Sequence, residues 1–135
     1  MILLDTSALI DAITGPKRSA SALRQAIERG ERVLLPALVL YEWLRGPRLR
    51  EELAAQEALF PGESAIAFGP KEASVAATLY GKVRRPRGRE LDLAIAACAL
   101  THEAKLWTLD VKDFSDVPGL RALLPGRDSG GEARP

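Results

Sequence analysis

The first eleven residues, MILLDTSALID, constrain the fold more than any other stretch of the chain. Ile2 to Leu4 form an apolar run that is too short for a helix and is typical of a buried strand in a parallel sheet. Asp5 follows directly, and apolar residues then recur at helical spacing. The pattern predicts strand, turn and helix, with Asp5 at the carboxyl end of the strand, where open α/β sheets bind ligands. Alternatively, Asp5, Thr6 or Ser7 only caps the helix.

Strands and helices are predicted to alternate along the rest of the chain. Predicted strands cover 32–35, 65–68, 105–109 and 120–124, and predicted helices cover 20–29, 37–45, 49–60, 70–83 and 90–104. This alternation predicts an α/β fold with a central, mostly parallel sheet of four or five strands and helices on both faces. We expect residues 1–125 to form a single domain and residues 126–135 to form a disordered tail.

The composition excludes several classes of protein. The 135 residues are 47% hydrophobic and 27% charged, as in soluble globular proteins. No apolar stretch approaches the ~20 residues of a membrane helix, so we expect no membrane association. No basic region precedes the first strand, so no signal peptide is expected and a cytoplasmic location follows. The single cysteine, Cys98, excludes an intrachain disulfide and is expected to be a buried, inert thiol.

Three further acids stand where a functional site would place them. Glu42 lies in a predicted helix that is apolar nearly all round, and a buried acid needs a partner or a metal. Arg45, close to one turn on, is an ordinary candidate partner. Asp92 interrupts an apolar helix in which another first-turn acid already serves the helix dipole, which favours a functional role. Asp110 ends a predicted strand in the same way as Asp5.

Four acids that converge on one crevice would stay ionised together only with a cation or with shared protons. Oxygen ligands select a hard ion, which predicts Mg²⁺ as cofactor with Mn²⁺ as a substitute. His102 is the only histidine, which argues against a Ser-His-Asp triad and a multi-Cys/His zinc site, and no Gly-rich or Walker nucleotide motif is present. The remaining chemistry is metal-activated water that attacks a phosphorus atom.

Arginines cluster in two segments, although the formal net charge is only +1. Such clusters are usually solvated surface, and a phosphate backbone is the main alternative. One cluster comprises Arg45, Arg48 and Arg50, and the other comprises Lys82, Arg84, Arg85, Arg87 and Arg89. The second cluster supplies the candidate RNA-binding residues Arg84, Arg85, Arg87 and Arg89.

Four motifs, in order along the chain, resemble the PIN-domain family, and within it the VapC toxins of prokaryotic type II toxin–antitoxin pairs. They are MILLDTSALID, the acid Glu42, LDLAIAA around Asp92, and TLDVKDFSDVPGL from Thr108 to Leu120. The resemblance implies a Mg²⁺-dependent endoribonuclease that is usually a homodimer and is inhibited by a VapB-like antitoxin. It matches the catalytic and metal-binding carboxylates of the family to Asp5, Glu42, Asp92 and Asp110.

The resemblance also matches Thr108 to a hydroxyl near the metal, and Thr6 and Ser7 beside Asp5 are further candidates. Many relatives have Asn where Asp110 stands and use the acid before the Phe, which is Asp113 here. Either residue can therefore be the fourth carboxylate.

Other functions stay open. A Mg²⁺-dependent phosphatase would usually have a second acid where Ser7 stands, and a non-catalytic PIN-like binding module need not retain all the acids. A receiver-type domain fits less well, because it needs paired acids after the first strand and a lysine at a late strand end. If the chain is a toxin, we expect its antitoxin to contact an apolar surface near Trp43 and Phe60, although core packing would explain these two residues equally well.

Overall fold

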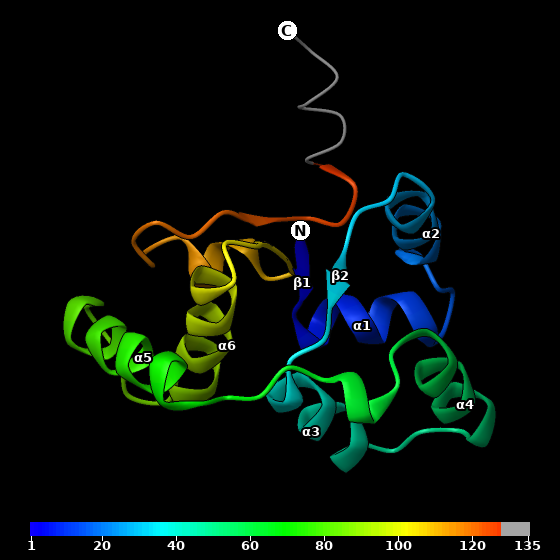
Figure 1. The fold of residues 1–135 in the computed structure, drawn as a ribbon, viewed down its shortest axis with the longest axis horizontal. Helices are drawn as coiled ribbons and strands as arrows, with labels where there is room; N and C mark the ends of the chain where they lie inside the picture. The colour runs from blue at the N-terminus through cyan, green and yellow to red at the C-terminus, as the bar shows by residue number, and fades with distance from the viewer. Residues whose placement is uncertain (128–135) are drawn as a thin grey trace, which may run out of the picture.

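A four-stranded parallel sheet forms the centre of the computed structural model, which describes residues 1–127 (Figure 1). The strands are β1 (Ile2–Leu4), β2 (Val33–Leu34), β3 (Lys105–Trp107) and β4 (Ala122–Leu123), and their order is β2-β1-β3-β4. All three pairings are parallel, and Leu4 of β1 lies opposite Trp107 of β3. The predicted α/β fold with a parallel sheet is therefore confirmed, with four strands.

Within residues 1–127, six α-helices flank the sheet. They are α1 (Thr6–Ile13), α2 (Ala20–Glu28), α3 (Ala37–Arg45), α4 (Arg50–Leu59), α5 (Pro70–Lys82) and α6 (Glu90–Thr101). Helix α1 contacts α2, α3 and α4 on one side of the sheet, and α5 packs along α6 on the other (Figure 1). Two short 3₁₀ helices, η1 (Gly62–Ser64) and η2 (Val111–Phe114), complete the described part of the chain.

The core sits around β1 and α6. All three residues of β1 are buried, because β1 has a paired strand on each side and helix α1 packs against it. In α6, the seven consecutive residues from Leu93 to Ala99 are buried between α5, α3 and β3. The small alanines in this run let α6 approach its neighbours closely. The predicted inert thiol of Cys98 belongs to this core, and burial raises its pKa to about 11.

One predicted strand, 65–68, is wrong. The segment forms only a single parallel bridge, between Ile66 and Pro36, and η1 precedes it. The N–H of Ile66 donates to the carbonyl of Leu35, and the N–H of Ala37 donates to the carbonyl of Ile66. The chain enters α3 immediately after Pro36, so pairing stops after one residue.

Several other elements are shorter than predicted. Helix α6 stops at Thr101 rather than at residue 104, because Glu103 adopts a left-handed backbone conformation with φ of +53°. Strand β3 stops at Trp107 rather than at residue 109, and β4 covers only Ala122–Leu123 of the predicted segment 120–124.

Helix α3 is buried on one face only, so the prediction of a largely buried helix is wrong. Val39 and Trp43 face the core, whereas Tyr41 and Leu44 are 55% and 53% exposed. Trp43 and Phe60 are both part of the core, as the alternative of core packing predicted, so neither side chain can contact an antitoxin. A contact on the surface near them stays a prediction. The guanidinium of Arg48 lies over the Trp43 ring, 4.2 Å from its centroid, and covers it from solvent.

The predicted C-terminal tail and the expected lack of a membrane span concern the chain as a whole. Residues 128–135, most of the predicted tail, lie outside the described residues, so the domain limit at residue 125 stays a prediction. No helix within residues 1–127 is long and apolar enough to cross a membrane.

Candidate active site

The candidate site lies where the carboxyl ends of β1 and β3 meet. The chain leaves β1 through α1 and α2 to pair β2 on one side, and it later returns to pair β3 on the other side. This change of direction makes the β1–β3 junction the topological switch point of the sheet, where open α/β folds bind ligands. Asp5 follows β1 and Thr108 follows β3, so both lie at this junction.

Asp5 is held in place by hydroxyl groups. The residue is only 5% exposed, and its Oδ2 accepts hydrogen bonds from Thr108 Oγ1 at 2.7 Å and from Ser7 Oγ at 3.2 Å. Asp5 occupies the N-cap position of α1, but its side chain makes no capping hydrogen bond. Burial raises the pKa of Asp5, and the hydrogen bond from Thr108 is the largest opposing influence. Helix capping therefore does not explain this carboxylate.

The hydroxyls of Ser7 and Thr108 also fix the turn after β3. Ser7 Oγ accepts the N–H of Leu109 at 2.9 Å, and Thr108 Oγ1 accepts the N–H of Asp110 at 3.0 Å. The two hydroxyls lie 3.2 Å apart. Two of the three predicted hydroxyls thus connect the start of α1 to the segment that carries Asp110.

The third predicted hydroxyl, Thr6, points to Glu42 instead. Thr6 Oγ1 donates a hydrogen bond to Glu42 Oε1, which connects α1 to α3. Glu42 Oε2 lies 3.5 Å from Nη2 of Arg45, so the ordinary ion pair considered from the sequence is present as well. Arg45 is more than half exposed, and such surface pairs contribute little stability. The pair therefore leaves Glu42 available for a role in the site.

Asp92 lies in the first turn of α6, and the charges of the other acids affect its pKa. Burial and, to a smaller extent, the charges of Asp5, Glu42 and Asp113 raise the pKa of Asp92 to about 6, while Arg89 opposes them. The carboxylates from α1, α3, α6 and η2 thus act on one another across a common space. The convergence of four acids on one metal site stays a prediction.

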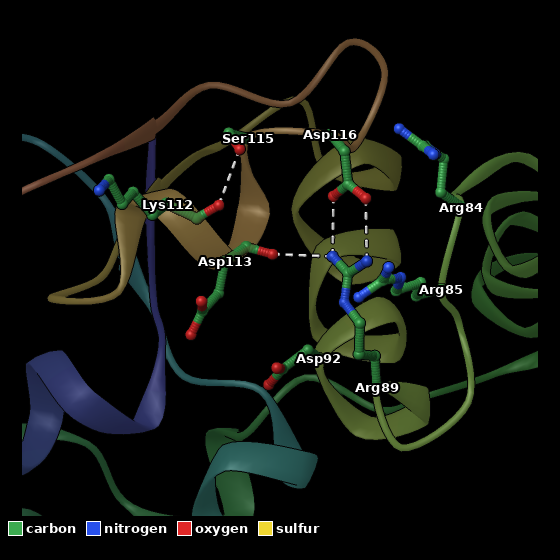
Figure 2. Close-up of a pocket in the computed structure, with 8 residues that line it drawn as sticks. All are labelled: Arg84, Arg85, Arg89, Asp92, Lys112, Asp113, Ser115 and Asp116. Atoms are coloured by element: carbon green, nitrogen blue, oxygen red, sulfur yellow. Dashed lines mark hydrogen bonds and ion pairs between the residues drawn. The ribbon is translucent and has the colours of Figure 1, made fainter.

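Asp110 and Asp113 flank the site from two directions. The charge of Asp110 contributes to the raised pKa of Asp5, whereas that of Asp113 contributes to the raised pKa of Asp92. Figure 2 shows the carboxylates of Asp113 and Asp92 turned toward the same space. Which of the two acids is the fourth carboxylate therefore stays open.

A cleft of about 590 Å³ opens beside Asp92, and basic and acidic side chains line it together (Figure 2). Its lining residues are Arg84, Arg85, Arg89, Asp92, Lys112, Asp113, Ser115 and Asp116. Three of the four candidate RNA-binding arginines reach this cleft, and the exposed Arg87 is not part of its lining. Sequence reasoning missed Lys112, Ser115 and Asp116, because nothing in their spacing connects them to an arginine more than twenty residues earlier in the chain.

The donor set fits a hard cation. Carboxylate and hydroxyl oxygens are the ligands that Mg²⁺ and Mn²⁺ prefer, and an ion would relieve the repulsion that raises the pKa of Asp92. Within residues 1–127, no three acid, His or Cys side chains lie close enough to hold one ion together. Mg²⁺ usually binds only one or two carboxylates and keeps several waters, so the site does not need three direct protein ligands.

The raised pKa of Asp92 predicts how stability depends on pH without metal. The pKa is about 6 in the folded chain and 3.8 ordinarily, so the folded state holds this proton more tightly than the unfolded state between these values. The contribution of Asp92 to the free energy of unfolding therefore falls as the pH rises from about 4 to about 6. In EDTA, Asp92→Asn should be more stable than the parent by roughly 1 kcal/mol above pH 6, after allowance for solvent screening, and equal to it below pH 4.

Urea unfolding of both proteins at several pH values measures this difference. A helix-capping role for Asp92 predicts the opposite sign, because loss of a first-turn charge costs roughly 0.3 to 1 kcal/mol. A variant that is less stable than the parent at pH 7 in EDTA would contradict the electrostatic coupling.

Comparison with known proteins agrees with the fold and the motifs. The profile of the PIN domain matches residues 2–120. The chain is 33% identical over 126 residues to Ribonuclease VapC19 of Mycobacterium tuberculosis, in strains CDC 1551 and H37Rv, and the alignment covers 90% of this chain and 98% of the relative.

Two solved structures have the same fold. DNA-bound VapBC from Salmonella typhimurium matches with a TM-score of 0.76 and 20% identity, over 90% of this chain and 96% of that chain. VapBC2 from Rickettsia felis, bound to a DNA fragment from its promoter, matches with a TM-score of 0.73 and 20% identity, over 92% and 98% of the two chains. Because the family profile spans nearly the whole described chain and the relative aligns over almost its full length, this chain belongs to the PIN-domain family and is a homologue of the VapC ribonucleases.

Proposed function

We propose that this protein is a Mg²⁺-dependent endoribonuclease, the toxin of a VapBC-type toxin–antitoxin pair. The observation that carries the proposal is the group of coupled carboxylates at the β1–β3 junction, where burial and neighbouring charges raise the pKa of Asp92 to about 6. The homologue with 33% identity is named a ribonuclease, which supports RNA as the substrate.

The acids that would hold the ion, and the hydroxyls that hydrogen-bond to them, come from segments far apart in the sequence. Asp5, Asp92, Glu42 and either Asp110 or Asp113 would surround the ion, one or two of them as direct ligands and the others through its coordinated waters. Mg²⁺, with Mn²⁺ as a substitute, supplies a nucleophilic water at neutral pH and stabilises charge on the phosphate oxygens. Thr108 and Ser7 orient the Asp5 carboxylate, and Thr6 orients that of Glu42. This chain's own contribution is to fix the carboxylates before the substrate arrives.

The arginines beside Asp92 suit a phosphate backbone. Arg84 and Arg85 are exposed and line the cleft, so their guanidinium groups are available to phosphates that lead to the site. Arg87 is exposed on the same segment and is a further candidate. Arg89 differs from these three, because its guanidinium is already paired.

The two rival functions fit less well. A phosphatase of the usual kind needs a second acid where Ser7 stands, and Ser7 instead hydrogen-bonds to Asp5 and to the backbone of Leu109. A non-catalytic binding module has no need for a group of acids that repel one another at a ligand-binding edge of the sheet.

RNA cleavage by the purified chain with Mg²⁺ or Mn²⁺ tests the proposal directly. Asp5→Asn and Asp92→Asn should each reduce cleavage at least about 100-fold, because each removes a charge that holds the ion. Glu51→Gln, at an exposed acid of α4 outside the site, is the matched control and should cleave like the parent. The products should carry 5′-phosphate and 3′-hydroxyl ends, since metal-activated water does not use the RNA 2′-hydroxyl. Cleavage that persists in EDTA, or 2′,3′-cyclic phosphate ends, would contradict the mechanism.

We further propose a VapB-like antitoxin as the protein partner and a homodimer as the assembly, in the cytoplasm. The structures that share this fold include VapBC complexes, which supports the partner. Exposed apolar side chains on or next to α3 and α4 offer the contact chemistry; they are Tyr41, Leu44, Leu49, Leu53 and Leu59.

Co-expression with the product of the adjacent gene tests the partner. A stable complex that co-purifies and suppresses RNA cleavage is the expected result. A chain that is harmless on expression alone and binds no small protein encoded beside it would contradict the toxin–antitoxin assignment.

A further inference from the structure

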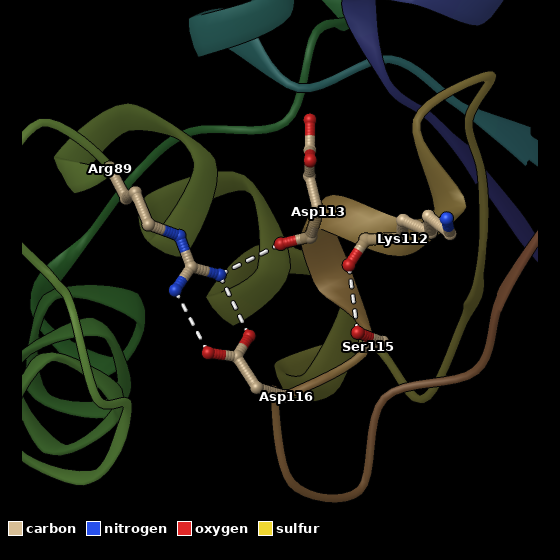
Figure 3. Close-up of polar contacts among 5 residues, drawn as sticks. All are labelled: Arg89, Lys112, Asp113, Ser115 and Asp116. Atoms are coloured by element: carbon tan, nitrogen blue, oxygen red, sulfur yellow. Dashed lines mark hydrogen bonds and ion pairs between the residues drawn. The ribbon is translucent and has the colours of Figure 1, made fainter.

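Arg89 is tied to the turn that carries Asp113 (Figure 3). Its Nη1 and Nη2 donate to the two carboxylate oxygens of Asp116 at 2.9 and 2.8 Å, and Nη2 also donates to the backbone carbonyl of Asp113 at 2.7 Å. The Arg89 side chain is only 22% exposed. A bidentate pair with a third hydrogen bond has a defined geometry, unlike most ion pairs at a surface.

The backbone of Arg89 is fixed just as firmly to helix α6. Arg89 is the N-cap residue of α6, three positions before Asp92, and its carbonyl accepts the N–H of Leu93 at 2.9 Å. Its N–H donates to the carbonyl of Pro86 across a turn in which Gly88 has a φ of +86°, a conformation that favours glycine. One residue therefore connects the helix that carries Asp92 to the turn that carries Asp113.

This connection through Arg89 opposes the electrostatic repulsion between the carboxylates of Asp92 and Asp113. Figure 2 shows the carboxylates of Asp92 and Asp113 turned toward the same space, and two like charges so placed repel each other. The buried Phe114 and Val117 anchor the turn from the core side, whereas Asp113 itself is exposed. The contacts of Arg89 act on the exposed side, where the repulsion would push the turn away.

We propose that Arg89 is a positioning residue, which with Asp116 holds the Asp113 carboxylate beside Asp92 so that both face the proposed metal site. The inference rests on the proposed function, and it assigns Arg89 a different role from the RNA contact expected from the sequence. Arg89 touches neither substrate nor metal, and it acts through the position of Asp113.

Mn²⁺ titration calorimetry on the full chain tests the inference with Arg89→Gln, Asp116→Asn and the double variant. Each single substitution should weaken Mn²⁺ binding about tenfold, the lower end of the effect of losing a supporting contact around a metal site. The double variant should bind no more weakly than either single variant, because both substitutions break the same contact. Arg121→Gln, at an exposed arginine outside the cleft, removes the same charge as Arg89→Gln and should bind Mn²⁺ like the parent.

The two single variants separate positioning from general electrostatics, because they change the net charge in opposite directions. Loss of Arg89 makes the cleft more negative and would by charge alone strengthen cation binding, whereas loss of the Asp116 charge would weaken it. A loss shared by both variants is therefore expected only if the pair acts as a unit. Arg89→Lys, which keeps the charge but not the forked geometry, should bind Mn²⁺ with an affinity between those of the parent and Arg89→Gln.

Binding of a short single-stranded RNA in EDTA separates positioning from a phosphate contact. If Arg89 contacts phosphate, Arg89→Gln weakens RNA binding, and Asp116→Asn frees Arg89 and leaves Mn²⁺ binding intact. That result, or Mn²⁺ binding by both single variants within twofold of the parent, would overturn the inference. If Arg89→Gln does not fold, as judged by its melting curve in EDTA, Arg89→Lys carries the test, because it keeps the charge and should still bind Mn²⁺ more weakly than the parent. A parent chain that neither binds Mn²⁺ nor cleaves RNA would instead refute the proposed function, on which the inference depends.

Discussion

The hydrogen bond from Thr108 to Asp5 joins the ends of the two central strands, and the arrangement of the site depends on it. Burial of a carboxylate is costly unless hydrogen bonds compensate it, and here two hydroxyls do so at the edge of the sheet. The same hydroxyls hold the backbone that leads to Asp110. The position of Asp5 therefore also fixes the backbone of the segment that carries Asp110. These side-chain hydrogen bonds join the two segments although strands β1 and β3 are short.

The fold keeps mutually repelling acids together by fixing their backbones elsewhere. Asp5 follows a strand that is buried along its whole length, and Asp92 lies in the first turn of a helix, where the next seven residues are all buried. Asp113 lies beside Phe114, which is anchored in the core. The apolar core thus opposes the electrostatic cost of the acids, as is usual where a binding site is less stable than the scaffold that carries it. A cation would remove much of that cost, so metal binding and folding stability are expected to be linked.

Local sequence patterns predicted those parts of the molecule that local forces decide. The apolar run before Asp5 and the uninterrupted apolar stretch after Asp92 have few other ways to be buried, and both predictions agree with the structure. Residues 65–68 have the composition of a strand, but no strand edge is available to them beyond Pro36. The exposure of Tyr41 depends on which neighbours reach the outer face of α3, which a periodic pattern does not reveal.

The role that we propose for Arg89 could not be predicted from the sequence for a similar reason. A run of arginines indicates positive charge but not which of them is neutralised, and Asp116, the partner of Arg89, is distant in sequence.

We propose that the acids at the β1–β3 junction bind one shared cation. A crystal structure of the chain with Mn²⁺, located by its anomalous scattering, tests this claim most directly. The account predicts a peak bordered by the carboxylates of Asp5 and Asp92, and the absence of a peak there at saturating Mn²⁺ would contradict it.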